Sequence, residues 1–517
     1  MSRTRKFAYG VGFGYINQIV LMASGLLLTP FLLQRLGTGK YGLWVVAAQL
    51  LLYLGLIDLG IVAIIPRSVA SIAGRTDPAG RDAAIAQLIT ATLRIVAAQT
   101  LFAACTAVVV LRFLPAQWEP IRTPLTALLV FYVLLFPFRL AQGILAGLQD
   151  TRFMGTVQLV AWGAGTLATV LLVFKGYGIA SLAAGWILTQ SCIALCSILR
   201  LKLRFPGTFP RRLSAIDPGA ARKLLGQGGW VSVSQVAQML LGGTDILLIG
   251  KILGPEAVVT YALTGKLIAV LANQPQMLMQ VAVPGLSEMR AAGSSVAIVR
   301  VASALIQGML LITGLVICVV MATNRAFVEA WVGKQHFGGF ALTMLLLVNL
   351  LLRHITVGAI YTIFAFGRER RIAIVSLLDG LVAMAVAALL LPVIGIAGAA
   401  VGLIAGVTLV SLPANYSALL SITGSTIRDF IRPLSPWALR FVPVVLLCAV
   451  IQQLLGPQNL VGAALIGLVV AVLYLVAMRV VLLQPPLSQY IPERILRVSA
   501  LSVGGRRQGA TPRQPPV

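Results

Sequence analysis

The chain has 517 residues, of which 59% are hydrophobic and only 10% are charged. Soluble domains carry about 25% charged residues, so this composition excludes a soluble globular protein. The formal net charge is +26, but most of the lysines and arginines fall on alternate loops between apolar runs. That asymmetry is typical of the topology signal of a membrane protein and does not indicate nucleic-acid binding.

The apolar runs predict an all-α polytopic membrane protein with about fourteen transmembrane helices. Runs of about 20–25 residues can cross a hydrocarbon core roughly 30 Å thick, whereas the strands of a β-barrel would alternate in polarity. The first run is too long for a cleaved signal peptide and is expected to remain as a span. In chain order the runs are 9–34, 42–65, 86–113, 124–148, 154–174, 178–199, 227–250, 257–283, 301–323, 342–366, 372–391, 395–418, 438–456 and 461–483.

An internal repeat relates the two halves of the chain. The segment GIASLAAG at 178–185 returns as GIAGAAVG at 395–402, an offset of 217 residues that also pairs Gly37 with Gly254. Two copies of a six-helix unit are typical of transporters, whose site lies where the copies face each other.

The repeat and the loops divide the chain into four parts. We predict a six-helix bundle at 1–210, a second at 218–420, two additional spans at 437–483 and a largely disordered cytoplasmic tail at 484–517. An even number of spans and the cation asymmetry place both termini in the cytoplasm. The basic connector at 200–223 is expected to contact anionic lipid.

The sequence gives little support for an enzyme. It has only two histidines, its longest outer loop is about 324–341, and no loop pairs two carboxylates. A nucleophile–base pair or a metal cluster is therefore not expected, nor is a cofactor. All five cysteines lie inside apolar runs, as packing residues do.

Three stretches carry a family resemblance. They are TPFLLQRLGTGKYGLW at 29–44 with LLLYLGLIDLGIVAIIPR at 50–67, TDILLIGKILGPEAVVTYALTGKL at 244–267, and ILAGLQDTRF at 144–153. They resemble the bacterial polysaccharide transporter family of lipid-linked oligosaccharide flippases, within the multidrug/oligosaccharidyl-lipid/polysaccharide exporter superfamily. The resemblance implies two pseudo-symmetric six-helix bundles in a V around a central cavity, which work by alternating access.

The resemblance also implies a function and its partners. A flippase of this family moves undecaprenyl-pyrophosphate-linked oligosaccharides from the cytoplasmic to the periplasmic leaflet of the bacterial inner membrane, for O-antigen, capsule or exopolysaccharide. Its expected partners are the lipid-linked oligosaccharide, membrane lipids and the polysaccharide polymerase or export machinery.

Cations inside the predicted spans are candidates for the pyrophosphate site, because buried charges rarely face lipid. Lys266 and Arg353, near the membrane midplane, are the first choices, and Arg139 and Arg94 are candidate entry residues at the cytoplasmic side. The two entry residues could instead snorkel to the interface.

Other polar residues inside the spans are candidates for glycan contact or ion coupling. The polar spacing on the seventh and eighth runs is compatible with single helix faces, although such residues also join helices to one another. Asp245 could pair with Lys266, and Asp379 with Arg353. The candidates are Asp58, Asp245, Asp379, Asn17, Gln18, Gln235, Gln238, Asn273 and Gln276.

Several alternatives remain open at this point. A cation-coupled multidrug exporter of the superfamily usually carries a carboxylate in its first span, and 9–34 has none. A lipid II flippase typically has basic residues in its first two spans, and 9–33 and 42–65 have none. A polytopic glycosyltransferase or polymerase would need a larger outer loop. A non-transporting scaffold of a polysaccharide synthesis complex is a more distant alternative.

Overall fold

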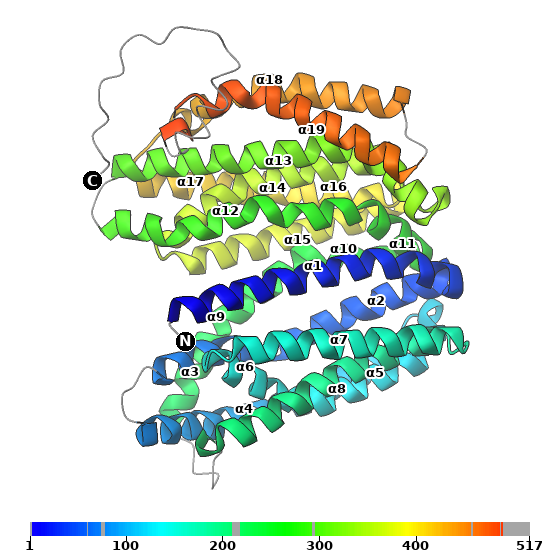
Figure 1. Ribbon diagram of the computed structural model, residues 1–517, viewed down its shortest axis with the longest axis vertical. Coiled ribbons are helices and arrows are strands. Elements are labelled where there is room, and N and C mark those ends of the chain that lie inside the picture. The colour runs from blue at the N-terminus through cyan, green and yellow to red at the C-terminus, as the bar shows by residue number, and fades with distance from the viewer. Residues whose placement is uncertain are drawn as a thin grey trace.

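A computed structural model describes residues 3–58, 60–73, 78–208, 218–291, 295–455, 459–485 and 487–489. Throughout these ranges the regular structure is helical and contains no strand. The long helices run side by side in two lobes, one above the other in Figure 1. The predicted all-α class is therefore confirmed.

The first eight α-helices form one lobe, which we call the N-lobe. Short 3₁₀ turns interrupt two of its spans, at Gly55–Asp58 between α2 and α3 and at Phe136–Phe138 between α5 and α6. The helices are α1 (Arg3–Leu36), α2 (Thr38–Leu54), α3 (Ile61–Ala73), α4 (Pro78–Arg112), α5 (Arg122–Leu135), α6 (Arg139–Gly147), α7 (Thr151–Phe174) and α8 (Ile179–Arg204).

The helices that follow form the C-lobe. Two of its spans bend sharply, by 48° between α9 and α10 and by 47° between α11 and α12. A π-helical turn at Val407–Ser411 separates α16 from α17. The helices are α9 (Pro218–Gly242), α10 (Thr244–Ile252), α11 (Pro255–Thr264), α12 (Lys266–Ala291), α13 (Ser295–Val332), α14 (Gly339–Ala365), α15 (Glu369–Ile394), α16 (Ala397–Gly406) and α17 (Leu412–Thr423).

Two further helices, α18 (Ile427–Leu455) and α19 (Leu460–Leu482), pack on α13 at the outside of the C-lobe. Within the described ranges, eleven helices are long and apolar enough to span a membrane, or up to thirteen if each bent pair counts as one span. The shorter apolar helix Val20–Leu36 is part of α1. The predicted count of about fourteen stays a prediction.

Glycines hold the same unusual backbone at matching places of the repeat. Gly37 (φ 81°, ψ 160°) and Gly254 (φ 94°, ψ 169°) precede α2 and α11, and Gly178 (φ 58°, ψ −134°) and Gly395 (φ 62°, ψ −148°) lie before α8 and α16. A positive φ is unfavourable for residues with a Cβ, so the turns require glycine. The offset of 217 residues thus relates structurally equivalent turns.

Helix contacts follow the same offset. In the N-lobe α7 contacts α1 and α8, and in the C-lobe the corresponding α15 contacts α9 and α16. Helix α9 also contacts α3 and α4 of the N-lobe, so it lies between the lobes (Figure 1). The proposed boundary between 210 and 218 falls in residues 209–217, outside the described residues.

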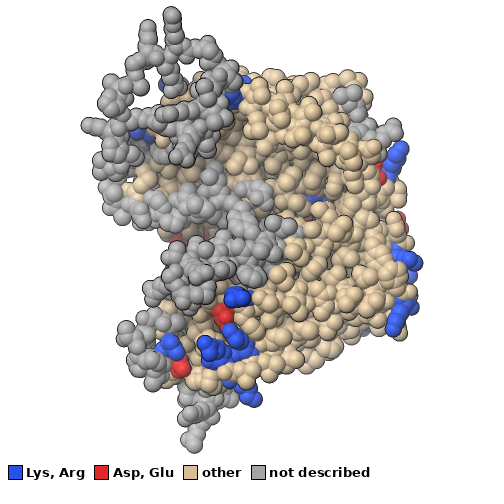
Figure 2. All heavy atoms as spheres, in the orientation of Figure 1, with Lys and Arg blue, Asp and Glu red and all other residues tan. Residues whose placement is uncertain are grey.

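We call the end that carries the turns at Gly37 and Gly254 the hairpin end, and the opposite end, where α1 begins and α19 stops, the terminus end (Figure 1). On the face drawn in Figure 2, lysine and arginine side chains gather toward these two ends, and most of the surface between them is uncharged. Exposed apolar side chains such as Leu27, Phe113 and Leu439, each more than 70% exposed, fit a surface that meets lipid.

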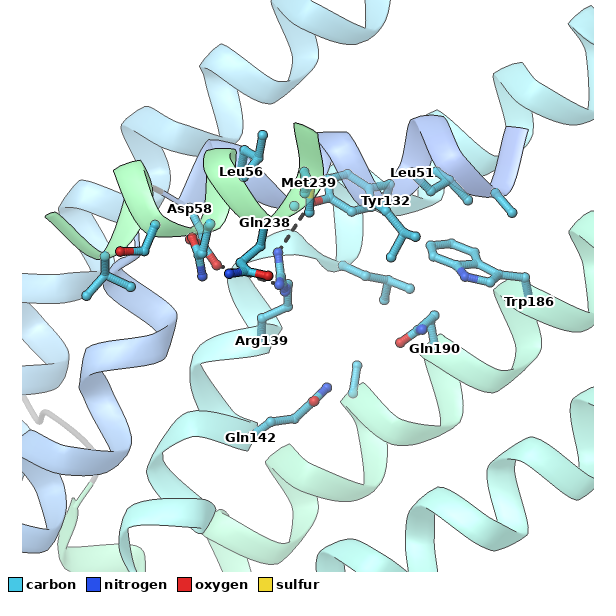
Figure 3. Close-up of a pocket in the computed structure, with 18 residues that line it drawn as sticks. Leu51, Leu56, Asp58, Tyr132, Arg139, Gln142, Trp186, Gln190, Gln238 and Met239 are labelled. Atoms are coloured by element: carbon cyan, nitrogen blue, oxygen red, sulfur yellow. Dashed lines mark hydrogen bonds and ion pairs between the residues drawn. The ribbon is translucent and has the colours of Figure 1, made fainter. Parts of the chain in front are cut away.

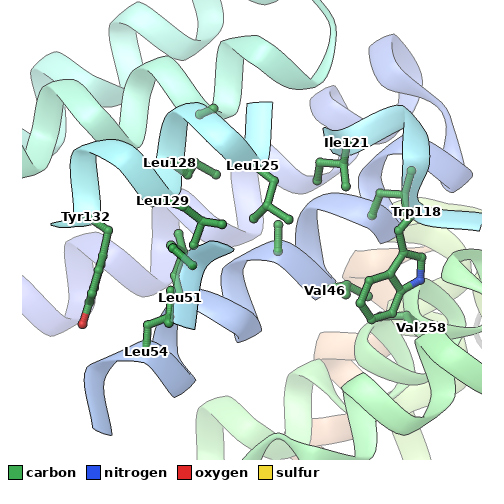
Figure 4. Close-up of a cluster of buried hydrophobic side chains, with 14 of the residues drawn as sticks. Val46, Leu51, Leu54, Trp118, Ile121, Leu125, Leu128, Leu129, Tyr132 and Val258 are labelled. Carbon is green, nitrogen blue, oxygen red and sulfur yellow. The ribbon is translucent and has the colours of Figure 1, made fainter. Parts of the chain in front are cut away.

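The hairpin end of the N-lobe has a continuous apolar core. Leu125, Leu128 and Leu129 of α5 are almost completely buried and pack against α2 (Figure 4). The same cluster includes Val258 of α11, so it extends across the boundary between the lobes. This core fixes α2 and α5, which carry part of the site described below. Of the predicted tail at 484–517, only residues 484, 485 and 487–489 are described.

Candidate functional site

A cavity of about 800 Å³ lies between the N-lobe and α9. Its volume falls within the range of roughly 300–1,000 Å³ that is usual for ligand sites. Helices of the N-lobe supply three walls and α9 supplies the fourth. The lining residues are Ala48, Leu51, Leu52, Gly55, Leu56, Asp58, Tyr132, Leu135, Arg139, Gln142, Trp186, Gln190, Ala194, Val231, Ser234, Gln235, Gln238 and Met239.

Arg139 carries the only positive charge among these lining residues. It stands at the first position of α6, directly after the 3₁₀ turn that contains Pro137. Its Nη2 lies 3.6 Å from Oδ2 of Asp58, and its Nη1 donates to the hydroxyl of Tyr132 at 3.2 Å (Figure 3). Its side chain is 35% exposed, and a guanidinium has five N–H donors, so donors remain for a ligand.

Asp58 is fixed by the break in the second span. Its Oδ1 accepts the backbone N–H of Gly60 at 2.7 Å, and its own carbonyl oxygen accepts Nε2 of Gln99 at 2.8 Å. The carboxylate is only 4% exposed. Asp58 is therefore a fixed counter-ion that holds Arg139 at the cavity wall.

Amide side chains surround this ion pair. Gln142 follows Arg139 on α6, Gln190 comes from α8, and Gln235 and Gln238 come from α9; Figure 3 labels three of the four. Trp186 adds an aromatic ring to the α8 wall. A single cation surrounded by amides and an aromatic ring can bind a phosphate together with sugar hydroxyls.

The structure brings four of the candidate residues to this cavity, namely Asp58, Arg139, Gln235 and Gln238. Sequence reasoning did not single out Tyr132, Gln142, Trp186, Gln190 or Ser234. Gln142 and Gln190 could have been found by the rule that selected Gln235, because they too are amides inside predicted spans. Tyr132 and Trp186 carry no such signal, since aromatic residues are common in spans.

Arg353, a first choice for the pyrophosphate, does not line this cavity and is paired within the C-lobe. Its Nη2 donates to Oδ1 of Asp379 at 3.0 Å, and Nη1 donates to Oδ2. Asp379 is completely buried and also accepts the hydroxyl of Ser411, the last residue of the π-helical turn. The alternative that Arg353 and Asp379 form a structural pair therefore matches the geometry.

Lys266, the other first choice, also lies away from this cavity. It begins α12 after the bend, and its Nζ approaches α1 at Gly25, so it faces the N-lobe. Asp245 makes no ion pair with it among the described contacts. The Asp245 carboxylate instead accepts the hydroxyl of Tyr261 at 2.6 Å and the N–H of Ile246 at 2.9 Å.

The remaining candidates are dispersed. Arg94 is exposed on α4 and does not line the cavity, and Asn273 and Gln276 lie on α12, exposed and half-buried respectively. Asn17 and Gln18 lie on α1, and their side chains fall outside the described residues.

At the hairpin end the lobes are in tight contact beyond the cavity. Nε1 of Trp118 donates to the carbonyl of Gly250 at 3.2 Å, and Nε2 of Gln117 donates to the carbonyl of Lys251 at 2.8 Å. A Cβ at Gly42 would lie 2.6 Å from the carbonyl carbon of Pro255, so α2 and α11 touch backbone to backbone. We call these hydrogen bonds and the close approach of Gly42 to Pro255 the hairpin-end contact.

Comparison with known proteins places this architecture in a class. Over 92% of this chain and 99% of the other, the fold matches a "Lipid II flippase MurJ, inward closed conformation", with a TM-score of 0.65 and 12% identity. It also matches the "Inward-facing conformation of a multidrug resistance MATE family transporter of the MOP superfamily", with a TM-score of 0.56 and 13% identity over 79% of this chain and 96% of that one. The chain therefore shares its fold with this flippase and this transporter.

Residues 119–338 match the family model described as "Polysaccharide biosynthesis protein". The matched region includes α5–α13 and hence Arg139 and the α8 and α9 walls of the cavity. Among curated proteins, none matches the sequence significantly. The family model and the fold both agree with the resemblance to the polysaccharide transporter family, and the two matched structures are a flippase and a transporter.

Proposed function

We propose that the protein is a flippase that moves undecaprenyl-pyrophosphate-linked oligosaccharides from the cytoplasmic to the periplasmic leaflet of the bacterial inner membrane. The supporting observation is the cavity in which Arg139 stands among glutamines at the junction of the lobes. The match to a polysaccharide biosynthesis family supports a glycan cargo. The products would be O-antigen, capsule or exopolysaccharide, and both termini would lie in the cytoplasm.

Each part of such a cargo has a counterpart in the cavity. A pyrophosphate diester needs a cation in a place of low dielectric, where the interaction is stronger than in water. Arg139 meets this need at the wall between α2 and α6. The sugar hydroxyls need partners that both donate and accept hydrogen bonds, and the side chains of Gln142, Gln190 and Gln238 do both.

The closed hairpin end supports alternating access as the mechanism. Because the lobes are in contact at that end, the cavity would receive its cargo from the terminus end, which the cation asymmetry assigns to the cytoplasm. Opening the hairpin-end contact would then expose Arg139 to the other side. No bond of the cargo changes, so the transport step needs no catalytic residue.

Deleting the gene and analysing the lipid-linked sugars of the host tests this proposal. We expect the complete repeat unit to accumulate facing the cytoplasm, and surface polysaccharide to be lost. An incomplete glycan would indicate an enzyme, and accumulation of lipid II would indicate the other cargo known for this fold. Unchanged polysaccharide with increased sensitivity to cationic drugs would overturn the proposal in favour of an exporter.

A further inference from the structure

A second cavity, of about 560 Å³, lies at the terminus end of the C-lobe. Its walls come from the start of α13, the end of α17, the start of α18 and the segment that follows α19. It shares no residue with the cavity around Arg139. It is therefore a separate site from the cavity proposed for the transported glycan.

The second cavity contains one charge of each sign. Arg300 of α13 and Asp429 of α18 both line it, yet no ion pair joins them among the described residues. Oδ2 of Asp429 accepts the backbone N–H of Thr426 at 2.8 Å and its hydroxyl at 2.9 Å, which holds the carboxylate at the start of α18. A held carboxylate and an exposed guanidinium that do not neutralise each other suit a ligand that carries both signs.

A buried hydroxyl without a partner also lines the space. Ser303 lies one helical turn after Arg300 and is only 4% exposed, and its Oγ has no hydrogen-bond partner. An unpaired buried polar group costs roughly 1–3 kcal/mol, so such groups are normally satisfied. A ligand oxygen beside Arg300 would satisfy Ser303.

We propose that this cavity binds a zwitterionic headgroup with a phosphate and a primary ammonium, of the phosphatidylethanolamine type. The phosphate would contact Arg300 and Ser303, and the ammonium would donate to the free oxygen of Asp429. An anionic headgroup would be repelled by Asp429. A trimethylammonium has no N–H to donate, and none of the lining residues is aromatic, as a site for that group would require.

The position of the cavity favours a membrane lipid over a soluble molecule. It lies where four helices end, at the depth of the headgroups in a protein that spans the bilayer. On the face of α18 opposite Asp429, Ile427 and Ile431 are 41% and 57% exposed, as expected where the start of this helix meets lipid. A lipid bound at this site would bridge α13 to α18 and to the segment after α19, and would stabilise their packing.

Native mass spectrometry of the full-length protein, with equal amounts of phosphatidylethanolamine, phosphatidylcholine and phosphatidylglycerol, tests the site. We expect phosphatidylethanolamine to be retained at least fivefold over either other lipid. Arg300→Gln should abolish this preference, and Asp429→Asn should remove the discrimination against phosphatidylglycerol while keeping the oxygen that caps Thr426. Arg428→Gln is the matched control, because Arg428 is exposed on the same turn of α18 and does not line the cavity.

The result that would overturn the proposal is equal retention of all three lipids, or equal loss in the Arg300 and Arg428 variants. Displacement of the bound lipid by soluble phosphoethanolamine at micromolar concentration would assign the site to a soluble ligand instead. Neither outcome depends on the transported cargo. The result of the lipid-binding experiment is therefore independent of whether the protein is a flippase.

Discussion

At the scale of residues, the cavity is organised by one partly neutralised cation. Asp58 lies 3.6 Å from Arg139 and is itself fixed by the N–H of Gly60. A ligand phosphate must compete with this carboxylate for the guanidinium. Asp58 would thus moderate affinity, so that the cargo can leave after it has crossed.

Asp58→Asn should strengthen the binding of anionic ligands. Asparagine can still accept the N–H of Gly60, but it no longer offsets the charge of Arg139. We expect a short-chain isoprenyl pyrophosphate to bind about five- to tenfold more tightly, roughly 1 kcal/mol, because Arg139 is 35% exposed and its charge is partly screened. Isothermal titration of the purified protein measures this change, and weaker binding would contradict the role of Asp58 as a counter-ion.

Arg353 should behave as a structural residue. Arg353→Gln leaves the buried Asp379 without its cation, which typically costs about 3–5 kcal/mol. The neutral pair Arg353→Gln with Asp379→Asn should recover most of this loss and retain transport. Measuring the thermal unfolding temperature in detergent and the transport activity of each variant tests this structural role. A single variant that is fully stable yet inactive would show instead that Arg353 contacts the cargo.

The sequence predicted the kind of residue at the site better than the individual residues. The rule that polar groups inside spans mark function identified Arg139, Asp58, Gln235 and Gln238. It also selected Arg353, because membrane depth does not tell whether a cation faces a cavity or a carboxylate on the next helix. The sequence offered the Arg353–Asp379 pair as an alternative, and the positions of α14 and α15 in the structure bring the two residues together.

At the scale of elements, breaks in helices position the functional groups. The 3₁₀ turn Gly55–Asp58 turns Asp58 toward α6, and the turn Phe136–Phe138 sets Arg139 at the start of α6. The bend between α9 and α10 lies where Tyr53 of α2 reaches Met239. The apolar runs predicted the spans but not these breaks, since hydropathy averages over a whole turn.

Gly42→Val should open the hairpin-end contact. The added side chain would overlap the backbone of Pro255, so α2 and α11 must separate. We expect a bifunctional thiol reagent to cross-link cysteines placed at 117 and 251, which are adjacent across the contact, several-fold less in this variant. Gly163→Val is the matched control, because no atom outside its own helix lies within 4 Å of the added Cβ. Equal cross-linking in both variants would contradict the account.

At the scale of the whole molecule, the two copies of the repeat keep the same turns but differ in polar content. The ion pair in the N-lobe lines the cavity, whereas the pair in the C-lobe is enclosed by α14, α15 and the π-helical turn. The repeat was visible in the sequence because glycine is required at the turns. The difference in polar content between the two copies was not visible in the sequence. It depends on which face each helix turns toward α9.

The most direct test of the central claim is transport of a lipid-linked oligosaccharide in proteoliposomes, with the leaflet of the glycan read by an impermeant lectin. We expect the native protein to expose the glycan on the opposite leaflet. Arg139→Gln should slow this at least tenfold, and Arg152→Gln, at an exposed arginine of α7 outside the cavity, should match the native protein. Equal transport by the Arg139 and Arg152 variants would contradict the role of this cavity, and no transport by the native protein would contradict the flippase itself.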